Sequence, residues 1–307
     1  MAGARTVRSW AAALACAVAL SGCGIGAAGQ RPLAAGTAPE ASATASASAS
    51  IPRVDEVNPA PDGIRAKGNS APDEAVTPWD LPAGSLYQNP ASGRREIIDP
   101  TVAQSVVLMG DSQSAGAAGV QGPNTWVQRA LAAQGYKVQF FGAGGTGFVA
   151  RTTLSPNYPD AVESGRALLP YGNPALVVVE GGGNDAGRGV TDAQILANAT
   201  RLVKDLKSSY PASKFLLIGT LAKGAANGGG RRTQIDDLLA GFARSNGLAF
   251  IGPGDWVTRY GVAAKLADGV HLTAEGHQVL GGVLAGQLKA LGLNGPPPKQ
   301  TPSQPPR

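Results

Sequence analysis

One serine and one histidine are the side chains of this chain best suited to chemistry together. Ser112 comes shortly after the apolar run 105–110, in the tripeptide Gly-Asp-Ser. The chain has only two histidines, His271 and His277, and the first of them follows Asp268 by three positions. A serine hydroxyl becomes a nucleophile when a base takes its proton, and an acid often orients that base. Ser112, His271 and Asp268 therefore predict nucleophilic catalysis if the fold brings them together.

Ser112, Asn184 and the two histidines also have purely structural explanations. Serine is a preferred helix N-cap, and Asn184, which follows a glycine, has a combination common in turns. His271 could be an ordinary surface histidine. His277 falls at helical spacing within residues 273–291, and we interpret it as a structural residue.

Five short apolar runs predict the strands of a parallel sheet. They are continuous rather than alternating, as expected of strands covered on both faces, and they span residues 105–110, 137–142, 175–181, 214–220 and 248–252. Helical patterns lie between or after them, at residues 124–134, 191–210, 233–245 and 273–291. This alternation predicts an α/β fold with helices on both faces of the sheet.

The polar segments follow the ends of these strands. The glycine-rich segment GAGGTGF (142–148) follows the second strand, and EGGGNDAGRG (180–189) follows the third. The segment DGVHLTAEGH (268–277) follows the fifth. In open parallel sheets the ligand site lies at the carboxyl ends of the strands. We therefore expect all three segments to meet Ser112 at one edge of the sheet.

These segments, in this order, resemble the sequence blocks of the SGNH (GDSL-type) hydrolases. The tripeptide ending at Ser112 is similar to the first block, the glycine-rich turn to the second, residues 182–185 (GGND) to the third and residues 268–271 (DGVH) to the fifth. Each motif is weak alone, but the resemblance covers roughly residues 104–291. It implies a flavodoxin-like three-layer α/β/α sandwich around a five-stranded parallel sheet. It also implies an esterase or lipase-like hydrolase. The chain would be a bacterial lipoprotein member of the family, from an actinobacterium.

The resemblance implies a role for four residues. Ser112 would be the nucleophile, His271 the general base and acid, and Asp268 the partner that fixes the imidazole. The substrate oxyanion would be held by the N–H of Ser112, a backbone N–H of the glycine-rich turn and the side-chain amide of Asn184.

Two positions depart from the family pattern. Gln113 stands where the family has leucine, which could alter packing or substrate contacts but removes no catalytic group. The second block lacks the usual asparagine and offers several glycines. Alignment on the family pattern points to Gly145 as the third oxyanion donor, with Gly147 as the next choice.

Residues 1–22 predict a lipoprotein signal peptide. Arg5 and Arg8 precede the apolar segment 10–20, which is too short for a stable membrane anchor. LSGC, ending at Cys23, matches the bacterial lipobox, which implies cleavage before this cysteine and its lipidation. An ordinary secretory signal with an incidental cysteine is the alternative. A lipidated Cys23 would hold the chain on the outer face of the cell membrane.

Composition divides the rest of the chain into three parts. Residues 23–100 contain ASATASASAS and many prolines and are predicted to form a flexible tether, of which 76–100 would at most pack loosely on the domain. The hydrolase domain is predicted at 101–293, and a Pro-rich disordered tail at 294–307. Cys16 would leave with the signal peptide, so no internal disulfide is expected.

Charge and motifs argue against several other functions. The formal net charge is +5, and it falls to +3 without the signal peptide, with no Lys/Arg-rich run that would predict nucleic-acid binding. Residues 142–147 fit a dinucleotide-binding pattern, but residues 148–160 contain two prolines and no helical stripe where that motif needs a helix. No cluster has metal-ligand spacing, so we expect neither a cofactor nor a metal.

Two alternatives to ester hydrolysis stay open at this point. The same acyl-enzyme could pass its acyl group to a sugar hydroxyl of an envelope glycan, which would make the protein an acyltransferase. A non-catalytic surface-binding lipoprotein could also use this scaffold. The intact set of Ser112, Asn184, Asp268 and His271 argues against the second alternative.

Overall fold

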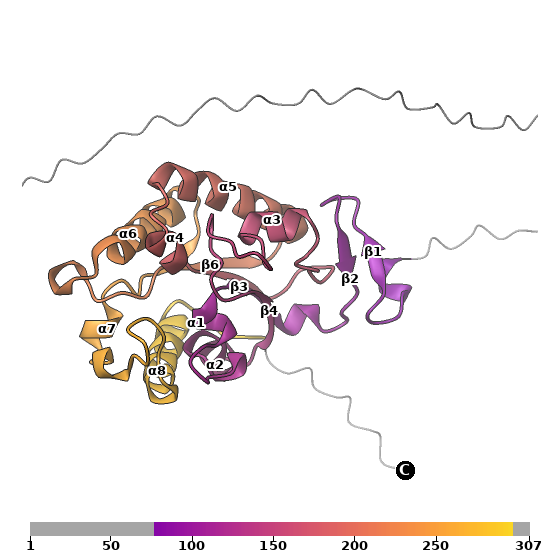
Figure 1. The fold of residues 1–307 in the computed structure, drawn as a ribbon. Helices are drawn as coiled ribbons and strands as arrows, with labels where there is room; N and C mark the ends of the chain where they lie inside the picture. Colours follow the sequence, from indigo (N-terminus) through magenta and orange to yellow (C-terminus); the bar gives the residue numbers. More distant parts are fainter. Residues whose placement is uncertain (1–76, 297–307) are drawn as a thin grey trace, which may run out of the picture. The chain divides into compact units, whose positions relative to one another are not determined.

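The computed structural model describes residues 77–296, which form an α/β unit around one central sheet (Figure 1). The five strands are all parallel and lie in the order β4-β3-β5-β6-β7. They are β3 (Ser105–Gly110), β4 (Lys137–Gly142), β5 (Leu176–Glu180), β6 (Lys214–Ile218) and β7 (Ala249–Ile251). The predicted flavodoxin-like parallel sheet is confirmed, and each observed strand lies within its predicted run. The predicted signal peptide and Cys23 lie outside the described residues.

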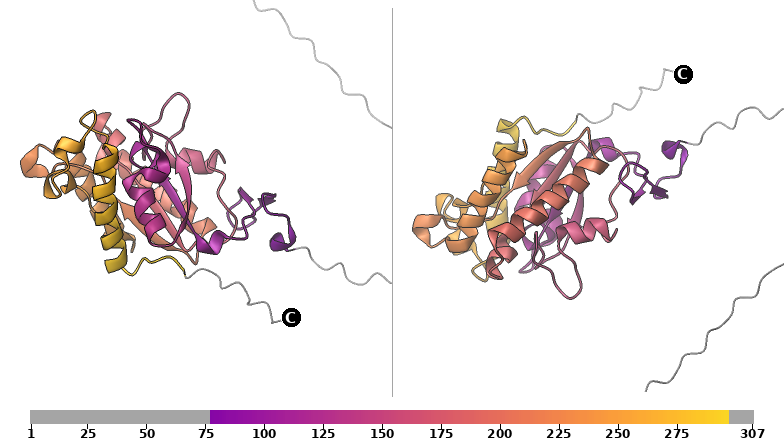
Figure 2. Two further views of the ribbon diagram at one scale, coloured as in Figure 1. Left: turned by 90° about the horizontal axis from the view of Figure 1, so that it is seen from below. Right: turned by 90° about the horizontal axis from the view of Figure 1, so that it is seen from above.

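Helices cover both faces of the sheet (Figures 1 and 2). One layer contains α1 (Ser112–Ala115), α2 (Trp126–Ala133), α7 (Trp256–Arg259) and α8 (Ala274–Ala290). The other contains α3 (Tyr158–Glu163), α4 (Gly183–Gly187), α5 (Asp192–Ser209) and α6 (Gly230–Ser245). The three-layer sandwich thus agrees with the expectation from the sequence.

The strand β3 shows why the apolar runs are continuous. All six of its residues are buried. Val106 and Leu108 belong to the core beneath α2 and α8, while Val107 and Met109 belong to the core beneath α3 and α5. A strand that supplies both cores has no polar face, so its apolar residues form a continuous run rather than an alternating one.

The helix α3 was not expected from the sequence. Residues 148–160 contain two prolines and no helical stripe, yet the chain turns into a helix at Tyr158. The Asn157 side chain accepts the Asp160 N–H at 2.9 Å, and Pro159 lies in the first turn. A proline is tolerated there because the first N–H groups of a helix have no partner inside the helix.

The folded part of the chain begins earlier than predicted, so the assignment of residues 77–100 to the tether is corrected. Strands β1 (Leu86–Gln88) and β2 (Arg95–Ile97) form an antiparallel hairpin, and Ile97 pairs through its backbone with the segment beside Pro170. Glu96 is fully buried and accepts hydrogen bonds from Asn89 at 2.7 Å and Ser209 at 2.9 Å. A polar network attaches this segment, which is why an apolar pattern did not reveal it.

The last described residues pack against the domain, and the predicted Pro-rich tail lies, from residue 297 on, outside the described residues. Leu293 is buried, and the Gly295 N–H donates to the Gln134 carbonyl at 2.9 Å. Between residues 77 and 296, no helix is long and apolar enough to cross a membrane.

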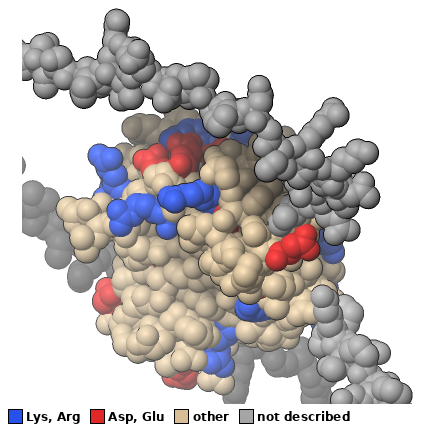
Figure 3. Space-filling model, turned by 90° about the vertical axis from the view of Figure 1, so that its right-hand side faces the viewer, with Lys and Arg blue, Asp and Glu red and all other residues tan. Residues whose placement is uncertain are grey.

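Charges of both signs are mixed on the surface. On the face shown in Figure 3, Lys and Arg side chains lie beside Asp and Glu side chains, with wide uncharged areas between them. Ion pairs such as Arg201 with Glu163 at 2.5 Å and Lys137 with Asp99 at 3.3 Å join such neighbours.

Candidate active site

Ser112 is held at the carboxyl end of β3 by a short, well-bonded turn. Asp111 is buried, and its carboxylate accepts the N–H of Gln113 at 2.8 Å as the N-cap of α1. Ser112 itself is half-buried, and its N–H donates to no other residue within 77–296. The turn therefore presents both the hydroxyl and the N–H of Ser112 to a substrate.

Two hydrogen bonds link Ser112 to the loop after β7. His271 Nε2 lies 2.8 Å from Ser112 Oγ, and His271 Nδ1 lies 2.6 Å from Asp268 Oδ2. The bond to the His271 ring holds the pKa of the Asp268 carboxyl below its usual range. This geometry allows the imidazole to take the serine proton while the carboxylate fixes its tautomer.

The loop that carries His271 is braced at three points. The second oxygen of Asp268 accepts the N–H groups of Val270 at 3.0 Å and His271 at 2.8 Å. Leu266 and Leu272 form an antiparallel bridge that closes the loop. Gln113 Nε2 donates to the Val270 carbonyl at 3.1 Å, so the residue beside the nucleophile is tied to this loop.

This contact explains the departure from the family pattern at Gln113. The sequence indicated only that a leucine is missing. A leucine could fill the same space, but it has no donor for the Val270 carbonyl, whereas the glutamine amide has one. Because Val270 precedes His271, the bond restrains the imidazole relative to Ser112.

Asn184 lies between the nucleophile turn and the glycine-rich turn. Its side-chain amide donates to Asp111 Oδ2 at 3.1 Å and to the Thr146 carbonyl at 2.9 Å. These bonds fix the orientation of the amide, and both of its hydrogens have a partner. A substrate oxyanion would therefore have to share one of the two Asn184 amide hydrogens with Asp111 or with the Thr146 carbonyl.

The glycine-rich turn offers two free backbone donors. The N–H of Gly147 donates to the Ala150 carbonyl at 2.9 Å, so it is occupied. The N–H groups of Gly144 and Gly145 donate to no other residue that the structure describes. Gly144, which the sequence did not single out, lies beside Ser112, since a Cβ built on it would be 3.6 Å from the Ser112 Cβ. Gly145 and Gly144 are therefore favoured over Gly147 as the backbone donor.

Gly147 is needed for a different reason. A Cβ at this position would lie 2.4 Å from Asp185 Oδ2, which is far closer than any real contact. Asp185 is fully buried and accepts the three N–H groups of residues 148–150 at 2.7–3.0 Å. The glycine lets this carboxylate approach the chain and hold the turn in place.

A second buried carboxylate lies beneath the nucleophile turn. Glu180, at the end of β5, is 1% exposed and accepts the Ser114 hydroxyl at 2.7 Å. Burial raises the pKa of Glu180 well above its ordinary value and raises that of Asp111 to about 6. Glu180, whose role the sequence did not reveal, thus supports α1 from below and has no exposed face for a substrate.

Comparison with known proteins agrees with this geometry. Residues 108–279 match the model of the GDSL-like lipase/acylhydrolase family, which is more than half of the chain. The chain belongs to this family. It is accordingly a hydrolase of carboxylic esters.

Two curated relatives of this GDSL hydrolase are similar in sequence. A GDSL lipase of Mycobacterium tuberculosis is 30% identical over 227 residues, which cover 70% of this chain and 96% of the lipase. Esterase TesA of Pseudomonas aeruginosa is 36% identical over 120 residues, which cover 38% of this chain and only 54% of that esterase. Among solved structures, a carbohydrate esterase family 2 enzyme of Myceliophthora fergusii has a similar fold. Its TM-score is 0.50 at 20% identity, covering 65% of this chain and 70% of the other.

The second histidine of this GDSL hydrolase has no place in the site. His277 is 1% exposed, and its Nδ1 accepts the backbone N–H of Trp126 at 3.0 Å at the start of α2. Burial lowers its pKa to about 4, so the ring is neutral at ordinary pH. This agrees with the structural role expected from its position in a helix.

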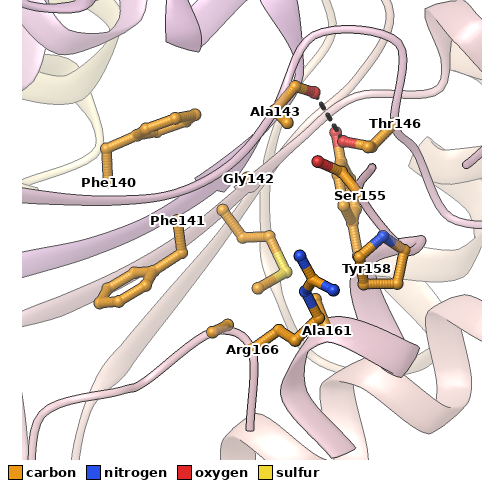
Figure 4. A pocket seen from close by; sticks show the side chains of 12 residues that line it. Phe140, Phe141, Gly142, Ala143, Thr146, Ser155, Tyr158, Ala161 and Arg166 are labelled. Carbon is orange, nitrogen blue, oxygen red and sulfur yellow. Dashed lines mark hydrogen bonds between the residues drawn. The ribbon is translucent and has the colours of Figure 1, made fainter. Parts of the chain in front are cut away.

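Two cavities border the site. One, of about 310 Å³, lies beside the glycine-rich turn and is lined by Phe141, Tyr158 and Arg166 among others (Figure 4). Another, of about 200 Å³, lies against Gly269 and Val270 in the loop of His271. The aromatic side chains of Trp126, Phe148 and Trp256 are buried in the two cores and line neither cavity. No group of three or more potential metal-ligating side chains occurs in the described part of the chain.

Proposed function

We propose that this GDSL hydrolase is a membrane-tethered, extracytoplasmic serine esterase that cleaves acyl or acetyl esters through an acyl-enzyme. The observation that carries the mechanism is the pair of short hydrogen bonds from Ser112 through His271 to Asp268. Three residues from two distant segments meet in the arrangement that activates a serine.

The first half of the reaction forms the acyl-enzyme. His271 Nε2 takes the Ser112 proton as Oγ attacks the ester carbonyl carbon, and Asp268 stabilises the imidazolium. The negative carbonyl oxygen accepts hydrogen bonds from the Ser112 N–H, a free N–H at Gly144 or Gly145, and the Asn184 amide. Collapse of this intermediate breaks the bond to the alcohol, which leaves with the proton from His271.

The second half releases the acid. His271 takes a proton from water, and the oxygen of that water attacks the acyl carbon. Collapse then returns the proton to Ser112 Oγ and frees the carboxylic acid. The enzyme ends in its starting protonation state, so no cofactor is consumed.

The proposed location rests on the segment before the described residues. Arg5, Arg8, the apolar run 10–20 and the lipobox at Cys23 support export and lipidation. Growth with an alkyne-tagged fatty acid should label the wild-type chain and leave Cys23→Ser unlabelled. Label on both proteins, or on neither, would argue against the anchor.

The proposed chemistry is tested with the full chain purified in detergent. Hydrolysis of 4-nitrophenyl acetate and butyrate should fall by about a thousandfold or more in Ser112→Ala, and a fluorophosphonate probe should label only the wild type. Equal turnover by both proteins, or an unlabelled wild type, would contradict the assignment of Ser112. Addition of a glycan acceptor, followed by product analysis, would detect acyl transfer in place of hydrolysis.

A further inference from the structure

Arg232 lies beside the site but takes no part in the proposed mechanism. It belongs to the first turn of α6, and its guanidinium lies against Gly183, the residue before Asn184. A Cβ built on Gly183 would be 2.7 Å from Arg232 Nη1, so the guanidinium lies directly against the chain at this position. A positive charge is thus held within one residue of a proposed oxyanion donor.

Arg232 differs sharply from its neighbour in the sequence. Arg231 donates to Asp192 Oδ1 at 2.5 Å and to the Val190 carbonyl at 2.9 Å. Arg232 is half-buried, and its side chain makes no ion pair or hydrogen bond with any residue between 77 and 296. The guanidinium has five N–H donors. Because those of Arg232 have no partner among the described residues, they can donate to an acceptor group of a bound ligand.

Two buried carboxylates feel the charge of Arg232, but both are hydrogen-bonded to other residues. The charge of Arg232 acts on Asp111 and Glu180, opposing the rise in pKa that burial causes. Asp111 accepts from Gln113 and Asn184, and Glu180 accepts from Ser114. Neither carboxylate lies within ion-pair distance of Arg232, so neither fully accounts for its position.

The cavity of about 200 Å³ introduced above connects Arg232 to the His271 loop. Gly269 and Val270 line it on one side, and Arg232 and the exposed Lys223 also border it. The apolar side chains of Leu221, Leu266 and Val270 line it as well, and none of the described residues that border it is acidic. An ester bound at Ser112 could place one end in this cavity, where it would meet two cations.

We propose that this cavity binds an anionic group of the substrate, a carboxylate or a phosphate, and that Arg232 selects for it. This inference rests on the proposed esterase function. The planar guanidinium can donate two parallel hydrogen bonds to either group, and Lys223 adds a second positive charge. The natural ester would then be an anionic one, such as an acylated acid or an ester that carries a phosphate.

A purely structural role for Arg232 makes a different prediction. If the guanidinium only balances Asp111 and Glu180, its loss would slow the hydrolysis of neutral and anionic esters to the same extent. A binding role would change the ratio between them. The informative quantity is therefore the ratio of kcat/KM for matched anionic and neutral esters.

Two matched pairs measure this ratio with the full chain. Mono-4-nitrophenyl succinate against 4-nitrophenyl butyrate places the charge on the acyl part, and 4-acetoxybenzoate against its methyl ester places it on the alcohol part. In one of the pairs the wild type should favour the anionic member. Arg232→Gln should lower that ratio by about tenfold, mainly through KM, because a charge-assisted hydrogen bond is lost. Arg232→Lys should retain part of the preference.

The neighbouring arginine provides the matched control. Arg231→Gln removes the same charge from the same helical turn, but Arg231 does not line the cavity, so the ratio should stay at the wild-type value. The preference should also weaken as ionic strength rises. Equal hydrolysis of both members of both pairs by the wild type would overturn the inference, as would equal losses in Arg232→Gln. The esterase proposal would survive either result if Ser112→Ala still abolished hydrolysis of 4-nitrophenyl butyrate.

Discussion

The two histidines of this chain lie six residues apart and have opposite surroundings. His271 sits in a loop with a quarter of its side chain exposed, between Asp268 and Ser112. His277 sits in α8 with 1% of its surface exposed, against the backbone of Trp126. The first is bonded to a carboxylate and a hydroxyl, whereas the second accepts a backbone N–H and has no ion pair with an acid among the residues that the structure describes.

The comparison shows that environment decides what a histidine does. A neighbouring carboxylate stabilises the charged ring that a general base must form, whereas burial without an acid disfavours that charge. His271 can therefore exchange protons with a substrate. His277 remains neutral and serves as a hydrogen-bond acceptor that joins α8 to α2.

The largest expected effect is the loss of activity when His271 is replaced. His271→Gln should lower kcat/KM for 4-nitrophenyl butyrate by about a thousandfold, because no base remains to take the Ser112 proton. The free energy of unfolding should change by less than about 0.5 kcal/mol, as is usual for loop positions. Parallel kinetic and urea-unfolding measurements test both parts. A large loss of stability would mean that the two histidines are not separated in function.

The converse change should act on stability. His277→Leu should lower the free energy of unfolding by about 1–3 kcal/mol, because the Trp126 N–H is left buried without an acceptor. The folded variant should still hydrolyse 4-nitrophenyl butyrate. Thermal and urea unfolding, with activity measured well below the transition, would check this. Loss of activity with an unchanged unfolding curve would place His277 in the site instead.

The pH dependence of stability should sharpen the comparison. The pKa of His277 is about 4 in the folded protein against 6.5 for a free histidine, so the unfolded chain binds the proton first as pH falls. The stability advantage of the wild type over His277→Leu should therefore be largest above about pH 6.5 and shrink toward pH 4. Asp111 and Asp236, whose pKa values burial raises to about 6 and about 7, act in the opposite direction. They are present in both proteins, so the difference between the two urea-unfolding free energies isolates His277. A difference that is independent of pH would contradict the assignment.

The smallest effect is expected from the residue that restrains the His271 loop. Gln113→Leu, which restores the family residue, removes the bond to the Val270 carbonyl and should lower kcat about fivefold. KM should change little, because Gln113 is buried and offers almost no surface to a substrate. Steady-state kinetics separate the two constants. A change confined to KM would instead indicate a contact with substrate.

Much of the fold could be predicted because it depends on local pattern. Continuous apolar runs predicted the five strands, and helical spacing predicted α2, α5, α6 and α8. The α3 helix and the β1–β2 hairpin escaped prediction. The first begins with an asparagine cap and a proline, and the second is attached by the buried Glu96 network. Neither leaves a periodic apolar signal.

By itself, the sequence determined which residues lie at the active edge of the sheet. Ser112, Asn184 and the Asp268–His271 pair all follow strands of a parallel sheet, and parallel strands end at one edge. Only the tertiary structure decided the contacts among residues far apart in the chain. Gln113 bonds to Val270, Trp126 to His277, and Arg232 rather than Arg231 faces the cavity. Such contacts depend on how packed elements meet in space, which no local spacing of residues encodes.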